Sequence, residues 1–207
     1  FDVVHASQVL HHLARPADAL REFGRGAGPE GIVAAREVDY EGVIWYPEVP
    51  ALRTWMDVYL QVHRSHGGEP SAGRRLKAWA REAGFTRVQA TGSVWVFASD
   101  EEREWWGGSW AERAVASKFA TDAIERGFAD RATLERIADG WREWATAEDG
   151  WLLMPHGELI ALRGHVHIGK TKVQTHTSMR RTYRDDLPED RAACDQPVRG
   201  AVQPRSR

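Results

Sequence analysis

The sequence has little that would mark a secreted, membrane-spanning or nucleic-acid-binding protein. It contains one cysteine, Cys194, so the chain cannot form an internal disulfide. No apolar run reaches the ~18 residues of a membrane span, and no signal-peptide pattern is visible. The 28 basic and 30 acidic residues nearly cancel, so neither nucleic acid nor an anionic membrane is expected as a partner. We therefore expect an intracellular, cytoplasmic protein.

The 207 residues are enough for one domain with a sizeable core. From Gly164 onward the composition changes, because the chain becomes rich in Arg, Thr, Asp and Gln and loses all sustained apolar periodicity. Such a segment cannot bury enough apolar surface to offset the entropy of ordering it. We therefore predict a folded region over residues 1–163 and a disordered tail over 164–207.

The first thirteen residues read as a buried strand that runs directly into a turn. Phe1, Val3 and Val4 form the short apolar run that is typical of a parallel strand covered on both faces. Small and polar residues follow at Ala6–Gln8, where the strand would end. Ligands of open α/β sheets bind beyond the carboxyl ends of the strands, so this tip is a candidate ligand site. The alternative is a core strand followed by an ordinary loop.

The rest of the folded region alternates helical and extended patterns. Ser99 and Glu102 form a capping box, which predicts a helix start there. The loop over residues 39–50 is the least regular part, and its aromatic side chains either line a pocket or pack over the next helix. The predicted helices cover residues 15–23, 51–65, a segment after Ser71, 100–126 with an interruption at Gly107-Gly108, and a segment with apolar residues at helical spacing from Leu134 to Trp144. The predicted strands cover residues 32–38 and 88–97, and a final strand or hairpin covers 151–162.

Three motifs point to ligands but lack the context that their mechanisms need. Gly24–Gly28 matches a glycine-rich cofactor loop, yet a helix precedes it and a strand follows, which is the reverse of the required order. Gly164–Thr171 fits a P-loop pattern, but no convincing helix follows. The pairs His165/His167 and His63/His66 lack a carboxylate or a third ligand at a spacing typical of metal sites, so we expect no metal site.

The beginning of the chain resembles a known family. Phe1–Val4 followed by Val9-Leu10-His11-His12-Leu13 is similar to the fourth strand of class I S-adenosylmethionine-dependent methyltransferases, nearest to the ubiquinone and menaquinone biosynthesis subgroup. Arg15–Glu22 resembles the next helix of that family. Gly28–Gly31 stands where the family usually has Arg-Pro-Gly-Gly, with Glu30 as a departure. The resemblance extends over residues 1–163 and is sharpest over 1–39.

The resemblance implies an α/β fold, specifically an incomplete Rossmann-like methyltransferase sheet with the family's strands in the order 4-5-7-6. The helical segment over about 100–147 resembles an insertion found in some members. The family's glycine-rich cofactor motif would precede Phe1, so the chain is expected to be the C-terminal part of the domain. The first strand would then be an apolar edge, through which the chain could self-associate.

The resemblance also implies roles for particular residues. The cofactor would be S-adenosylmethionine, with Ala6, Ser7 and Gln8 near its methionine and methyl end. A small-molecule acceptor would receive the methyl group. One of His11 and His12 would act as the general base; the alternative is that both only cap or pack the turn. The residues that would face the acceptor are Asp39, Tyr40, Trp45 and Tyr46.

Two other functions remain open at the level of the sequence. The chain could be a non-catalytic fragment, or a half-domain that needs a partner chain to bind cofactor. A weaker alternative is a P-loop nucleotide-binding protein, which depends on Gly164–Thr171 alone.

Overall fold

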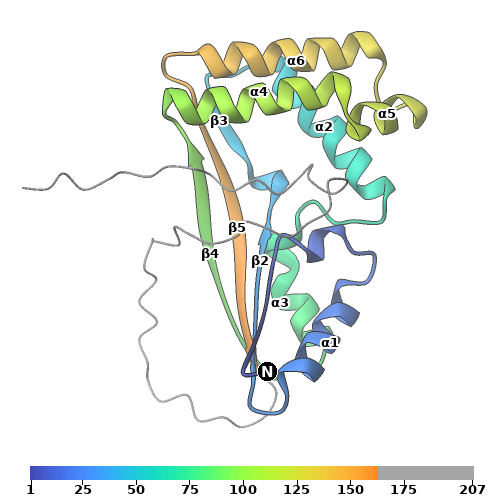
Figure 1. The fold of residues 1–207 in the computed structure, drawn as a ribbon, viewed down its shortest axis with the longest axis vertical. Coiled ribbons are helices and arrows are strands. Elements are labelled where there is room, and N and C mark those ends of the chain that lie inside the picture. Colours follow the sequence, from blue (N-terminus) through green and yellow to red (C-terminus); the bar gives the residue numbers. More distant parts are fainter. Residues whose placement is uncertain (163–207) are drawn as a thin grey trace, which may run out of the picture. The chain divides into compact units, whose positions relative to one another are not determined.

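The computed structural model describes residues 1–162, which form one mixed sheet with helices (Figure 1). The predicted tail, the P-loop pattern and the pair His165/His167 lie outside these residues. No helix in the described part is long and apolar enough to span a bilayer. The strands are β1 (Val3–Ser7), β2 (Ile32–Val38), β3 (Ile44–Tyr46), β4 (Arg87–Phe97) and β5 (Trp151–Leu162); the helices are α1 (Pro16–Ala27), α2 (Pro50–Ser65), α3 (Ala72–Glu82), α4 (Asp100–Ala116), α5 (Lys118–Glu125) and α6 (Arg131–Thr146), with single 3-10 turns η1 (Leu10–His12) and η2 (Tyr40–Gly42).

Strand β5 organises the sheet. It pairs antiparallel with β2 on one side and along the whole length of β4 on the other, while β1 pairs parallel with β2. The resulting order β1-β2-β5-β4 matches the expected succession of strands, and the short strand β3, which also pairs with β5, is an addition to it. The sequence left a strand or a hairpin open for residues 151–162, and the structure has one continuous strand through Pro155.

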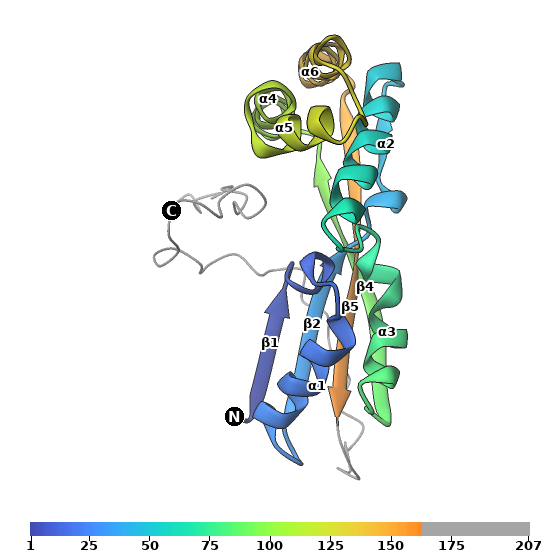
Figure 2. The same cartoon turned by 90° about the vertical axis from the view of Figure 1, so that its right-hand side faces the viewer.

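Helices α1 and α3 lie on the same face of the sheet and bury its lower half (Figures 1 and 2). The alternation along β2 explains which residues they cover, because Val33, Ala35 and Glu37 are buried while the preceding residues Ile32, Ala34 and Arg36 are only half-buried. Leu20 of α1 and Leu76 of α3 are almost fully buried against this face. This packing fixes the tips of β1 and β2, where the site lies.

Helices α2, α4, α5 and α6 form a second core around the far end of β5, and tryptophan supplies much of its volume. Trp55 contacts the rings of Trp110 and Trp141 edge-on, with centroids 4.8 Å apart in both pairs. The predicted interruption at Gly107-Gly108 is wrong, since α4 continues to Ala116 and the break falls at Ser117. Gly107 instead permits a close approach to α6, because a Cβ there would lie 2.7 Å from the Ala145 Cβ. The predicted capping box is confirmed.

Candidate functional site

The chain turns sharply where β1 ends, as the apolar-to-polar change at Ala6–Gln8 predicts. Ala6 is buried and Ser7 is exposed, while Gln8 has a φ of 59°, in the left-handed region that non-glycine residues rarely adopt. The backbone N–H of Gln8 still donates to the Arg36 carbonyl on β2 at 2.9 Å. Backbone strain of this kind concentrates at ligand sites, so the turn is a credible place for one.

Glu37 holds this turn in place from the neighbouring strand. Its side chain is fully buried and accepts hydrogen bonds from the backbone N–H groups of Val9 (2.9 Å), Leu10 (2.7 Å) and, more weakly, His11 (3.4 Å). The Nδ1–H of His11 donates to the Oε2 of Glu37 at 2.6 Å. One buried carboxylate thus satisfies four donors of Val9 and η1, and it fixes both the backbone and the His11 ring.

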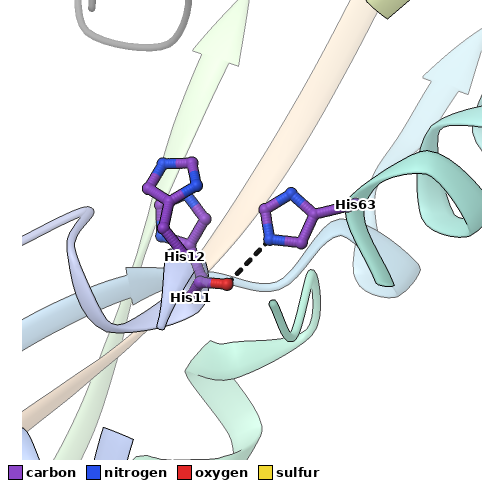
Figure 3. A group of neighbouring side chains, drawn as sticks. All are labelled: His11, His12 and His63. Atoms are coloured by element: carbon purple, nitrogen blue, oxygen red, sulfur yellow. Dashed lines mark hydrogen bonds between the residues drawn. The ribbon is translucent and has the colours of Figure 1, made fainter. Parts of the chain in front are cut away.

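Three histidines gather at η1 (Figure 3). The His11 and His12 rings lie 3.8 Å apart between centroids, and His63 of α2 lies 5.4 Å from His11 and 5.3 Å from His12. The Nε2–H of His63 donates to the His11 carbonyl at 2.7 Å. Gly68 makes this contact possible, because a Cβ there would lie 2.5 Å from that carbonyl oxygen and 2.6 Å from the His63 Nε2.

Burial and the proximity of the rings lower the pKa values of His12 and His63. Desolvation lowers the pKa of His12 to about 3, with further lowering by His11 and His63. Desolvation is also the main cause that lowers the pKa of His63 to about 4, against a smaller opposing contribution from its bond to the His11 carbonyl. At pH 7 both side chains therefore carry an unprotonated ring nitrogen, which can accept a proton or bind a metal ion.

Gln8 contacts a fourth histidine, on β5. The Nδ1–H of His156 donates to the Met154 carbonyl at 3.1 Å, so its Nε2 accepts from the Gln8 amide at 2.9 Å. Burial, with a smaller contribution from the Arg36 cation, lowers the pKa of His156 to about 3. The side chain is 3% exposed and packs against Trp95 at 4.4 Å. The hydrogen bond between Gln8 and His156 is thus a second side-chain contact that holds the strained turn, besides those of Glu37.

The four residues expected to face an acceptor divide into two groups. Asp39 is buried and binds Arg74 bidentately, at 2.6 and 2.7 Å, and it also borders an open hollow of about 350 Å³ between α3, β4 and β5. The Tyr40 ring packs on Tyr59 of α2, 4.2 Å away, inside the helical core. Trp45 and Tyr46 lie on β3, where Trp45 packs against that core and Tyr46 is 58% exposed. The structure therefore brings His11 and His12 together with Gln8 around the β1 turn, and puts Tyr40, Trp45 and Tyr46 elsewhere.

Sequence reasoning missed Glu37, His63 and His156 as members of the site. A signal existed for Glu37, because the charged residues Arg36 and Glu37 lie inside a central strand that is otherwise apolar, and a charge buried there must have partners. His63 had been considered only with His66, whereas its ring faces η1 and His66 pairs with Asp122 at 3.1 Å. Nothing in the sequence pattern points to His156.

A candidate site at the tips of a parallel strand pair, with the helices α1 and α3 on one face of the sheet, is an arrangement typical of α/β proteins. A family model for a methyltransferase domain matches residues 1–90, which include β1, its turn and β2. An uncharacterized methyltransferase of Schizosaccharomyces pombe is 30% identical over 162 residues. That alignment covers 77% of this chain and 57% of the relative, so the chain spans little more than half of that protein's length. Both of these comparisons are therefore with methyltransferases.

Similar solved structures are more distant. Phosphoethanolamine N-methyltransferase 2 of Haemonchus contortus, in complex with S-adenosyl-L-methionine, is 12% identical with a TM-score of 0.38 and covers 80% of this chain and 34% of its own. A putative sarcosine dimethylglycine methyltransferase from Galdieria sulphuraria is 14% identical with the same TM-score, over 80% and 54% of the two chains. At these TM-scores the likeness is too remote to identify a substrate.

Proposed function

We propose that this chain takes part in the transfer of a methyl group from S-adenosylmethionine to a small-molecule acceptor, within the subgroup related to ubiquinone and menaquinone biosynthesis methyltransferases. The observation that carries the proposal is the methyltransferase-domain match over residues 1–90, since that range contains the whole β1 turn and the tip of β2. Ala6, Ser7 and Gln8 would then meet the methyl end of the cofactor. Methyl transfer depends mainly on in-line positioning and exclusion of water, for which a rigid strand tip is suited.

The proposal assigns the general base to the histidines of η1. His11 is the better oriented of the two, because its Nδ1–H donates to Glu37 and its Nε2 is left to take a proton from the acceptor. His12 is exposed, and its pKa is lowered far below neutral pH, which disfavours it as the base. On the acceptor side the proposal keeps Asp39, because it borders the open hollow. Tyr40 packs in the helical core and Trp45 and Tyr46 lie on β3, so these three are not proposed to contact the acceptor.

Calorimetric titration of the folded chain with S-adenosylhomocysteine tests the proposal. We expect binding in the micromolar range, weakened at least tenfold by Gln8→Ala, because this residue carries both the left-handed turn and the bond to His156. Gln61→Ala is the matched control, since Gln61 is an exposed glutamine on α2 that bonds only to the Asp57 carbonyl of its own helix. A folded chain that binds no S-adenosylhomocysteine would support the alternative of a half-domain that needs a partner chain.

The proposal includes self-association through β1. Among the described residues β1 pairs only with β2, and Phe1 and Val3 are 91% and 54% exposed. Charged residues on an edge strand prevent pairing with another chain, so Val3→Lys is expected to shift a concentration-dependent dimer to monomer in sedimentation velocity. Ile124→Lys on α5 is the control, since its side chain is similarly exposed at 42% but lies far along the chain from β1. A monomer at every concentration, or equal effects of the two lysines, would contradict this part of the proposal.

A further inference from the structure

The three-histidine cluster at η1 has the composition of a metal site. One ring nitrogen from each of His11, His12 and His63 lies within 4.8 Å of those of the other two. Imidazole nitrogen is a preferred ligand of Zn²⁺ and of Co²⁺, Ni²⁺ and Cu²⁺, and three histidines with an open fourth position form a known type of zinc centre. We propose that His11, His12 and His63 bind a divalent transition-metal ion, with zinc as the expected physiological ion.

The partners of the rings support this assignment. A histidine that binds a metal nearly always donates its other ring N–H to a carboxylate or a backbone carbonyl. His11 donates its Nδ1–H to the Glu37 carboxylate, and His63 donates its Nε2–H to the His11 carbonyl. In both side chains the second ring nitrogen is left with a lone pair. Two of the three ligands are therefore already held in a defined tautomer by buried groups.

The two carboxylates beside the cluster in the described part of the chain already have partners. Glu37 accepts four hydrogen bonds. Glu69, whose backbone N–H donates to the His11 carbonyl, accepts from the Ser71 N–H and pairs with Arg75. The remaining ligands of the cluster are imidazole nitrogens, which favours nitrogen-preferring metals over Mg²⁺ or Ca²⁺.

The present spacing requires a small adjustment on binding. Zinc–nitrogen bonds of about 2.0–2.1 Å put tetrahedral ligand atoms about 3.4 Å apart. The ring nitrogens of the cluster lie within 4.8 Å of one another, so each distance must shorten by at most about 1.4 Å when the ion binds. His12 is exposed and can rotate, whereas His11 and His63 are buried and held by hydrogen bonds. An exposed third ligand leaves the fourth position open to water or to another molecule.

The inference stands apart from the proposed methyl transfer, because it concerns binding of the ion alone. The two uses of the cluster exclude one another, since a metal on the His11 Nε2 removes the lone pair that a general base needs. Metal binding without binding of S-adenosylhomocysteine would therefore support the metal site and count against methyl transfer. Binding of S-adenosylhomocysteine without metal binding would support methyl transfer and count against the metal site.

The test uses the full chain freed of metal by a chelator. We expect Co²⁺ to give the visible absorption of a low-coordinate nitrogen site, and Zn²⁺ to bind 1:1 in calorimetry. His12→Asn and His63→Asn should each weaken Zn²⁺ binding at least tenfold. His5→Asn, an exposed histidine on β1, and a double variant of His165 and His167 are the controls and should leave the affinity unchanged.

His12→Asn is the decisive variant, because its exposed side chain can be replaced without disturbing the core, and circular dichroism checks that the fold is kept. Absence of Zn²⁺ binding by the unmodified chain would overturn the inference. So would binding that survives both cluster variants, or binding that the double variant of His165 and His167 abolishes.

Discussion

Replacing Glu37 by alanine is expected to lower the free energy of unfolding by about 3 to 5 kcal/mol. The substitution leaves the backbone N–H groups of Val9 and Leu10 and the Nδ1–H of His11 buried without their acceptor. Water cannot easily replace the carboxylate, because the site is fully buried. Urea unfolding followed by tryptophan fluorescence gives the measurement.

The matched control for this substitution is Glu22→Ala on α1. Glu22 forms an exposed ion pair with Arg25, and such pairs contribute only about 0 to 1 kcal/mol. Glu37→Gln keeps one acceptor oxygen and should fall between the two variants. If Glu37→Ala costs no more than Glu22→Ala, the carboxylate does not hold the turn, and the orientation assigned to His11 loses its basis.

Acidification is expected to destabilise the fold strongly between pH 7.5 and pH 5. Histidine in the unfolded chain takes up protons below pH 6.5, whereas the folded chain protonates His63 only near pH 4 and His156 only near pH 3. In this interval the unfolded state binds more protons, so stability decreases as pH falls, and each of the two side chains contributes a loss of about 2 kcal/mol at pH 5. His12 adds less, because it is exposed.

The measurement is the midpoint of urea unfolding at pH 7.5 and at pH 5. The slope of the transition should be the same at both pH values if unfolding is two-state. His156→Gln should remove about half of the pH-dependent loss, since the glutamine cannot titrate. His5→Asn should leave the loss unchanged, because His5 is exposed. A loss that persists in full in a His63→Asn and His156→Gln double variant would show that other groups cause it.

The sequence predicted most of the elements because their signals are local. Apolar runs marked β1 and β2, the capping box at Ser99 and Glu102 marked the start of α4, and helical spacing marked α2 and α6. The error at Gly107 has a tertiary cause. Glycine weakens an isolated helix, but here it allows α4 to approach α6 closely, and nothing local in the sequence distinguishes the two uses.

The candidate site was predicted only where its residues adjoin the β1 strand. Gln8, His11 and His12 follow that strand directly, so the strand-tip rule found them. Glu37, His63 and His156 come from three other elements, and no spacing in the sequence connects them with η1. Tyr40 was predicted for the site but lies outside it. The loop pattern allowed either a pocket or packing for its ring, and the contact with Tyr59 decides for packing.

The position of β5 in the chain has a consequence for biosynthesis. Among the described strands, β3 and β4 pair with β5 alone, and β5 is the last of them to be synthesised. At ribosomal rates of about 5–20 residues per second, the 53 residues between Phe97 and Trp151 delay the pairing of β4 by roughly 3 to 11 s. During that time Val94 and Val96 lie on an eleven-residue strand with no described partner. We therefore expect slower translation between β4 and β5 to lengthen the exposure of the nascent chain to aggregation.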